Sequence, residues 1–299
     1  MADVVKRSSN TAIKHSVMKY FKLSLLLLAT VMVSCSKDLD VPSDGDLVLN
    51  RVSGTFSVSP DKQVRFSPGN LQYNAVLHKW RFAEHQYDYI DSLNSNIGSH
   101  YDGWIDLFGW GTSGFIVSPY CASTEVEDYG NGNRGAEDNN YDWGRFITIT
   151  NAESGARVWR TLTSTEWEYL IEGRMKAKEK LAPASVCGHP GIVLLSDNFH
   201  KPDSCTFLAT FDNGFESNIY EEWQWRKMEA AGAIFLPAAG YRYGDIVDEV
   251  DITGYYWTSS YFEDGTAYAL NFDAYEEDLS VPPINLYYGH SVRLVRDVK

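Results

Sequence analysis

Strand-like segments open this chain, two helical patterns follow them, and further strand-like segments close it. Strands are expected where β-branched and aromatic residues recur between Pro and Gly boundaries. Because strands and helices are segregated along the chain, they favour an α+β domain over alternating βαβ units. We therefore expect two helices, short antiparallel strands and long irregular loops. The expected strands are residues 55–59, 63–66, 80–82, 233–236, 255–259, 267–272 and 291–295.

The first helical pattern covers residues 163–175 and begins with an N-terminal signature. Thr163 and Glu166 have the spacing of a capping box, and Leu162 and Trp167 are placed to form a hydrophobic staple. A helix of this kind buries one apolar face against the core. The residues expected to share that face are Trp167, Leu170, Ile171 and Met175.

The second helical pattern runs from about residue 218 to residue 231, and Gly232 is its expected stop signal. Outside the helices, residues 101–115 are predicted to form an irregular packed segment. Residues 128–143, rich in Asn, Gly and Asp, are predicted to form a long loop. The residues expected to share one face of the second helix are Tyr220, Trp223, Met228 and Ala231.

An apolar run at residues 23–33 follows the basic residues Lys19 and Lys22. The run has about half of the ~20 residues that a membrane-spanning helix needs, so it favours a secretion signal. Residues 32–35 (MVSC) resemble a lipobox, in which the cysteine thiol is acylated and the signal is cleaved just before it. We therefore predict a lipid on Cys35. An ordinary signal peptide that ends near a cysteine is the alternative.

This anchor defines the expected organisation and location. Residues 36–40 (SKDLD) resemble the acidic export tags of Bacteroidota surface lipoproteins, although a solvated acidic linker has the same composition. We expect the protein to be held at the outer membrane by the lipid and to be exposed at the cell surface. The predicted parts are a lipoprotein signal sequence over 1–34, an acylated cysteine and linker over 35–53, and a single domain over 54–299.

Charge and cysteine content narrow the classes of partner. Residues 1–34 carry five basic and one acidic side chains, so their removal changes the formal net charge from −14 to −18. A protein this acidic repels phosphate backbones, which argues against a nucleic-acid partner.

Apart from Cys35, an odd number of cysteines remains, and of these Cys187 and Cys205 are the more favoured disulfide pair. Neither they nor Cys121 has the spacing of a metal site.

Several segments together carry a family resemblance. Residues 66–73 (FSPGNLQY) and 103–111 (GWIDLFGWG) resemble the upstream half of Bacteroidota lipoproteins that have a C-type-lectin-like fold. The C-terminal pattern is shared with the fibrobacter-type major paralogous domain and with variable proteins of diversity-generating retroelements. The segments that resemble the formylglycine-generating-enzyme branch of the C-type-lectin-like (sulfatase-modifying-factor-like) fold are 159–169 (WRTLTSTEWEY), 233–242 (AIFLPAAGYR), 254–260 (GYYWTSS) and 291–295 (SVRLV).

The resemblance implies a lectin-like domain whose two terminal strands are neighbours, with a ligand face formed between Trp257 and Arg293. Two departures bear on its chemistry. The Arg-Gly-Gly-Ser-Trp segment of active formylglycine-generating enzymes is absent, and no cysteine lies beyond Cys205 to bind copper. The calcium-ligand motifs of sugar-binding C-type lectins are also absent. We therefore expect no enzyme activity and no cofactor, with structural calcium left open by acidic clusters at 245–251 and 273–278.

The segment from Trp257 to His290 interleaves aromatic and acidic side chains. Tyr offers a stiff apolar ring and a hydroxyl group, as in antibody paratopes and sugar-stacking sites. The alternative is that half of these rings fill the core, as Leu270 and Phe272 are expected to do. No catalytic or metal-binding residue is assigned. The expected ligand-binding residues are Trp257, Tyr261, Phe262, Glu263, Asn271, Asp273, Tyr275, Glu276, Tyr287, Tyr288 and His290.

Three hypotheses about function follow. The leading one is a surface-anchored, non-enzymatic protein that recognises a glycan or protein ligand through this face. The second is an enzyme that has the same fold and a different active site, which histidines clustered with carboxylates in a deep pocket would favour. The third is a structural or fimbria-associated envelope lipoprotein, which a long exposed strand edge would favour.

Overall fold

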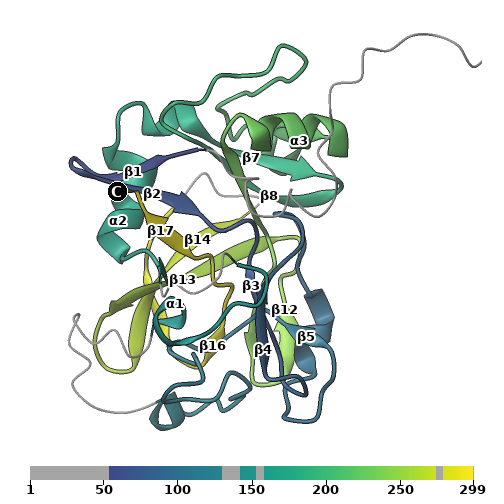
Figure 1. Cartoon of the computed structure of the whole chain (residues 1–299), viewed down its shortest axis with the longest axis vertical. Helices are drawn as coiled ribbons and strands as arrows, with labels where there is room; N and C mark the ends of the chain where they lie inside the picture. The colour runs from purple at the N-terminus through teal and green to yellow at the C-terminus, as the bar shows by residue number, and fades with distance from the viewer. Residues whose placement is uncertain (1–53, 130–141, 153–157, 274–278, 299) are drawn as a thin grey trace, which may run out of the picture. The chain divides into compact units, whose positions relative to one another are not determined.

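Figure 1 shows the computed structural model, which describes residues 54–129, 142–152, 158–273 and 279–298. The predictions on residues 1–53, including Cys35, lie outside the described residues, as do Tyr275 and Glu276. By its contacts, the chain from Asp44 to Lys299 forms one unit. Within the described ranges, no helix is long and apolar enough to cross a bilayer. The secondary structure is α+β, with short, mostly antiparallel strands.

The first sheet joins the two ends of the described chain, in the order β1-β2-β17-β6. Strand β17 pairs antiparallel with β2, with Val295 opposite Phe66, so the expected pairing of the terminal strands is present. Figure 1 places the C-terminus beside β1 and β2. The expected strand at 291–295 is displaced, because the paired segment begins only at Val295. The bounds are β1 (Phe56–Ser59), β2 (Lys62–Phe66), β6 (Trp159–Arg160) and β17 (Val295–Asp297).

Helix α2 (Ser164–Glu168) continues into a π-helical turn, η4 (Tyr169–Gly173). The predicted capping box is confirmed: Thr163 Oγ1 accepts from the Glu166 N–H at 3.2 Å, and Glu166 Oε2 accepts from the Thr163 N–H at 3.0 Å. The prediction for Met175 is wrong, because the chain leaves the helix at Arg174 and Met175 is 80% exposed. The other three members of the predicted face are buried.

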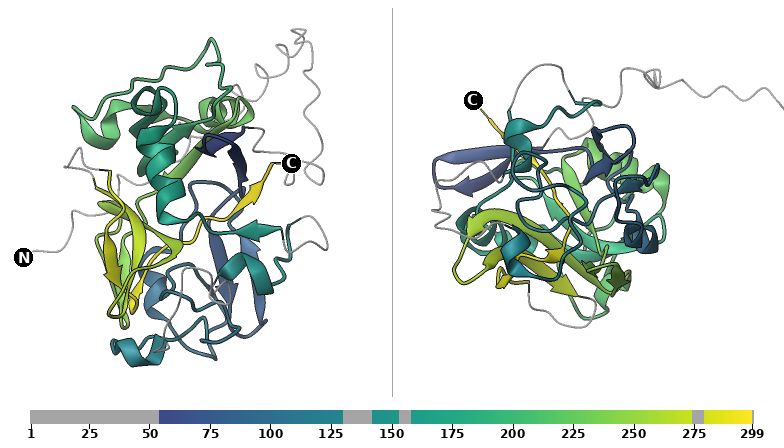
Figure 2. Two further views of the ribbon diagram at one scale, coloured as in Figure 1. Left: turned by 90° about the vertical axis from the view of Figure 1, so that its left-hand side faces the viewer. Right: turned by 90° about the horizontal axis from the view of Figure 1, so that it is seen from below.

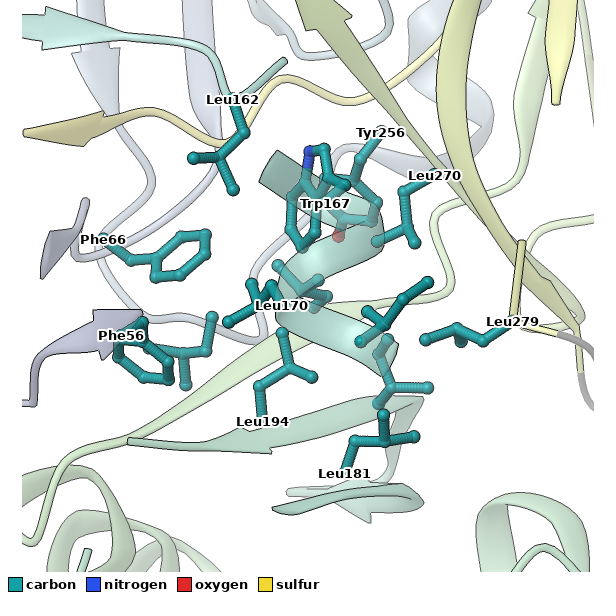
Figure 3. Packing of buried hydrophobic residues seen from close by; sticks show 14 of the residues in the cluster. Phe56, Phe66, Leu162, Trp167, Leu170, Leu181, Leu194, Tyr256, Leu270 and Leu279 are labelled. Carbon is teal, nitrogen blue, oxygen red and sulfur yellow. The ribbon is translucent and has the colours of Figure 1, made fainter. Parts of the chain in front are cut away.

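Around this helix lies the first core cluster. Trp167 and Leu170 lie between Phe56 and Phe66 on one side and Leu270 on the other (Figure 3). Helix α2 therefore packs against strands from both ends of the chain, as the further views in Figure 2 show. This core includes both sequence-predicted residues of β14, since Leu270 and Phe272 are buried.

A second sheet has the order β10-β8-β7-β9. Its central hairpin, β7–β8, was not expected from the sequence. The two strands are joined by Cys187 and Gly188, which both have positive φ, at 53° and 85°. Successive side chains of this sheet point alternately into the first core cluster and into a second cluster that includes residues of helix α3. Figure 1 shows α3 beside β7 and β8. The bounds are β7 (Leu181–Val186), β8 (His189–Leu195), β9 (Ile219–Tyr220) and β10 (Ala233–Pro237).

Helix α3 (Glu222–Ala230) is shorter than expected. It begins at Glu222 and not at about residue 218, so a different set of side chains faces the core. The expected apolar face is wrong at Trp223, which is 53% exposed, whereas Trp225 and Met228 are buried. Tyr220 is also buried, but it belongs to β9 and not to the helix. Gly232, with φ of 100°, follows the end of the helix as predicted.

Neither favoured cysteine forms a disulfide, so this prediction is wrong. Cys205 is buried beside helix α3, where its thiol donates to the Gln224 carbonyl at 3.6 Å. Cys187 lies in the β7–β8 turn and interacts with the Tyr87 hydroxyl instead.

Three further three-stranded sheets complete the domain: β13-β14-β15, β12-β11-β16 and β4-β3-β5. Side chains of β3, β4, β5, β13 and β14 contribute to a separate core cluster, together with aromatic residues outside these sheets such as Phe108 and Trp143. The strand bounds are β3 (Leu71–Asn74), β4 (Lys79–Phe82), β5 (Trp104–Ile105), β11 (Tyr241–Tyr243), β12 (Ile246–Asp248), β13 (Thr253–Tyr261), β14 (Thr266–Asp273), β15 (Pro283–Asn285) and β16 (Tyr288–Gly289). The short helices are η1 (Asp91–Ser95), η2 (Val126–Tyr129), α1 (Trp143–Phe146), η5 (Ala177–Lys180) and η6 (Gly214–Ser217).

Candidate functional site

Five tyrosine rings contact one another at the surface; four lie on β11, β13 and β16, and the fifth, Tyr287, directly precedes β16. Tyr288 is central: its ring centroid lies 5.6 Å from that of Tyr241, 5.5 Å from that of Tyr243 and 5.2 Å from that of Tyr287. Tyr241 also meets Tyr255 edge to face, at 5.9 Å. Each ring is partly or largely exposed, and Tyr243 is 40% exposed. We call Tyr241, Tyr243, Tyr255, Tyr287 and Tyr288 the tyrosine cluster.

On strand β11, alternation places the rings of Tyr241 and Tyr243 outward. Tyr241 and Tyr243 flank Arg242, which points inward and is fully buried. Its guanidinium donates to the carbonyl oxygens of Leu107, Cys121 and Gly244, so it joins strand β11 to the loop that follows β5. Opposite Arg242 stands Gly289, where an added Cβ would lie only 2.9 Å from the Arg242 Cβ. A glycine is therefore required for the two strands to pair at this position.

The histidine of the predicted face lies beneath the tyrosine cluster and not within it. His290 is 1% exposed and stacks on Tyr255, with ring centroids 4.7 Å apart. It also stacks on Tyr288 at 6.0 Å. Burial lowers the pKa of His290 to about 3, although the Gly289 backbone favours its charged form. The imidazole is therefore neutral at physiological pH and supports the tyrosine rings from below.

Trp257 is also removed from the predicted surface. It is 1% exposed, and its indole N–H donates to the Phe108 carbonyl at 2.6 Å. The prediction placed it on the ligand face because the family resemblance begins that face at Trp257. Its side chain lies on the same face of β13 as Tyr255, but it is covered by the aromatic core cluster. Trp257 and His290 therefore contribute to the face only through packing.

Other predicted residues lie around the β13–β14 hairpin. Phe262 and Glu263 are exposed at its tip, where the Phe262 ring meets Tyr268 at 5.3 Å. The partly buried Tyr261 ring packs on Trp110. A chain of contacts joins the tip to the tyrosine cluster, because Asn285 pairs with Thr266 and donates to the Tyr287 hydroxyl at 2.9 Å.

The other predicted polar residues lie toward the open end of the hairpin. Asn271 stands opposite Tyr255 in the strand register, and its side chain interacts with the Tyr255 hydroxyl. Asp273 is partly exposed two residues further along the same strand. The predicted polar residues Asn271 and Asp273 therefore lie on β14, beside the tyrosine cluster.

The pKa values of three hydroxyls of the cluster, those of Tyr241, Tyr255 and Tyr287, are raised. Burial raises the pKa of Tyr255 to about 12, and the Glu249 carboxylate adds to the effect. The pKa of Tyr241 is raised by burial and by Glu249 and Asp248. Burial, followed by the neighbouring Tyr288, raises the pKa of Tyr287. These groups therefore offer O–H donors as well as ring faces at physiological pH.

The acidic cluster at residues 245–251 is one of the two clusters for which structural calcium was left open. Two of its carboxylates accept hydrogen bonds from the protein, Glu249 from Thr253 and Asp251 from Tyr89. Among the described residues, no group of three or more His, Cys, Asp or Glu side chains is placed to hold a metal ion. The second acidic cluster lies mostly outside the described residues.

Tyr241, Tyr243 and Tyr255 were missed by sequence reasoning. A signal for the first two was present: alternating residues lead into Gly244-Asp245, a pair typical of a two-residue hairpin turn. Their contact with Tyr288 depends on the pairing of β11 with β16, which are distant in the sequence.

Comparison with known proteins gives no assignment: no family model, no curated protein and no solved structure matches this chain.

Proposed function

We propose that this chain is a lipid-anchored surface protein without enzymatic activity, which recognises an extracellular glycan or protein ligand. The tyrosine cluster carries the proposal. Its rings form a contiguous aromatic surface. The pKa values of Tyr241, Tyr255 and Tyr287 are raised, so these hydroxyls are protonated and can donate hydrogen bonds. Tyrosine supplies large and stiff contact area at small entropic cost, which suits recognition better than catalysis.

The proposed fold is the C-type-lectin-like fold of the formylglycine-generating-enzyme branch, in a Bacteroidota lipoprotein. Three features support it: the neighbouring terminal strands β2 and β17, the two helices α2 and α3 that pack on the sheets, and the irregular segments between short strands. The ligand face of that resemblance corresponds to the region that holds Tyr287 and Tyr288. We include β11 in this proposed face, because Tyr241 and Tyr243 contact Tyr288.

The tyrosine cluster can be tested by binding. Full-length protein in detergent is applied to an array of purified glycans and an array of purified extracellular proteins, and the affinity for each hit is measured. The double substitution Tyr243→Ala and Tyr287→Ala is expected to reduce affinity by roughly 30-fold or more, since central aromatic residues commonly contribute about 2 kcal/mol or more. Tyr169→Ala, which truncates a partly buried tyrosine of η4, serves as the matched control and keeps the parent affinity.

Two results would overturn this proposal. One is a hit that the double variant binds as tightly as the parent while its thermal melting is unchanged. The other is the absence of any hit on both arrays.

Anchoring is tested separately. Cys35→Ser is expected to abolish incorporation of radiolabelled palmitate and to release the protein from the membrane fraction, because acylation requires the thiol. Cys121→Ser removes another unpaired thiol and should leave labelling intact. Palmitate incorporation into the Cys35→Ser variant would show that the lipobox assignment is wrong.

A further inference from the structure

A cavity separate from the tyrosine cluster opens between the β3–β4 hairpin, the turn at residues 113–120 and residues 146–148. Its volume is about 610 Å³. No residue that lines it belongs to the tyrosine cluster. We call it the aromatic pocket.

Aromatic rings form the walls of this pocket. Tyr73 packs on Trp80 with ring centroids 4.6 Å apart, and Tyr120 meets Tyr73 at 6.0 Å. On the other wall, Phe115 stacks on Phe146 at 4.3 Å and with nearly parallel planes. Phe115 is nevertheless 56% exposed, an unusual position for a ring of this size on a water-facing turn. Such rings offer flat apolar faces to a ligand.

The exposed ring is positioned by a tight turn. The Gly114 N–H donates to the Val117 carbonyl at 2.9 Å, and Gly114 has φ of 81°. This turn holds Phe115 and Ile116 at its tip, where Ile116 is 49% exposed. The mouth of the pocket is therefore lined by apolar side chains, and a backbone hydrogen bond holds the turn that carries them.

A buried hydroxyl without a partner lines the same pocket. Ser113 is 1% exposed, and its Oγ has no hydrogen-bond partner among the described residues. A buried polar group left unpaired costs about 1–3 kcal/mol, so a ligand that bonds to it gains affinity. Tyr73 and His78 add a second polar point, with the hydroxyl 3.4 Å from the imidazole Nδ1.

Charge selects the class of ligand. The described residues that line the pocket include no Asp, Glu, Lys or Arg, although the chain as a whole has a formal net charge of −14. A phosphate, carboxylate or ammonium group would therefore find no opposite charge in the pocket. A ligand that is neutral, has apolar faces for the rings and carries hydroxyls for Ser113 matches all three observations.

We propose that the aromatic pocket binds one neutral hexose residue, with its ring against the aromatic walls and a hydroxyl group on Ser113 Oγ. A peptide aromatic side chain would also fit the walls, but its phenyl ring leaves the Ser113 hydroxyl unpaired. This inference does not depend on the tyrosine cluster, because the two sites are altered by different substitutions.

The test uses full-length protein in detergent, titrated with the methyl glycosides of glucose, galactose, mannose and N-acetylglucosamine. Trp80 lies in the pocket wall, so its fluorescence and saturation-transfer NMR report binding. Ser113→Ala is expected to reduce the affinity about tenfold, equivalent to one good hydrogen bond, without lowering the melting temperature. Phe115→Ala should also lose about tenfold, whereas Tyr169→Ala, which truncates a ring outside the pocket, should have no effect.

Four outcomes would overturn the proposal. The first is that none of the four glycosides binds at millimolar concentration. The second is that N-acetylphenylalanine amide binds and the glycosides do not, which would assign the pocket to an apolar peptide side chain. The third is glycoside binding that Ser113→Ala leaves unchanged. Loss of binding in the Tyr243 and Tyr287 double variant would place the sugar at the tyrosine cluster instead.

Discussion

Replacing Trp167 with alanine is expected to lower the free energy of unfolding by about 3–5 kcal/mol. The side chain is 1% exposed and lies where helix α2 meets strands from both ends of the chain. Its ring centroid is 5.8 Å from that of Phe66, so truncation leaves a cavity next to the terminal sheet. Urea unfolding followed by circular dichroism measures the change.

Trp223→Ala provides the matched control. It removes the same side chain from the other long helix, but from a position that is 53% exposed and contacts only the Lys227 ammonium among the interactions described. Its effect should remain within about 0.5 kcal/mol. If Trp167→Ala were as mild as Trp223→Ala, the helix would not be part of the core described here.

Stability should also depend on the ionisation of Asp106. This carboxyl is fully buried, with hydrogen bonds from the Asn94 amide at 2.8 Å and the Ile90 N–H at 3.0 Å. Burial raises its pKa from 3.8 to about 7, outweighing those hydrogen bonds. The folded state therefore holds this proton more tightly than the unfolded state. The resulting stabilisation is fully present below about pH 4 and is lost as pH rises through about 7.

The size of this effect is of the order of 4 kcal/mol, since each pKa unit corresponds to about 1.4 kcal/mol. Asp106→Asn removes the titration while preserving the shape of the side chain. Urea midpoints measured from pH 4 to pH 8 should fall more steeply for the parent than for this variant. Asp203→Asn, which removes an exposed carboxyl, should follow the parent. Parallel profiles for the parent and Asp106→Asn would show that Asp106 is not protonated in the folded protein.

Local signals in the sequence predicted the parts of the fold that depend on neighbouring residues. The capping box of Thr163 and Glu166 and the stop at Gly232 were found because each uses contacts within one turn of a helix. The β7–β8 hairpin was missed because Cys187 occupies a left-handed position that usually favours Gly or Asn. The face of helix α3 was misplaced because its first residue, Glu222, is set by the preceding strand β9.

The candidate site was predictable only in part. Tyr287 and Tyr288 were found because they are aromatic residues in an irregular, polar segment. Tyr243 reaches them through a strand pairing that no local pattern reveals. Composition could not separate exposed rings from supporting ones, so Trp257 and His290 were assigned to the surface although they are buried.

The pairing of β2 with β17 also determines when this domain can fold. Val64 and Phe66 lie near the beginning of the described chain, and their partners Asp297 and Val295 are almost its last residues. During synthesis, the edge of β2 that pairs with β17 has no partner until the residues of β17 have been made. Contacts between residues so far apart slow folding, because a long loop must close before they form. Any factor that binds the unfolded chain therefore has until the residues of β17 are made to engage it before the terminal sheet can close.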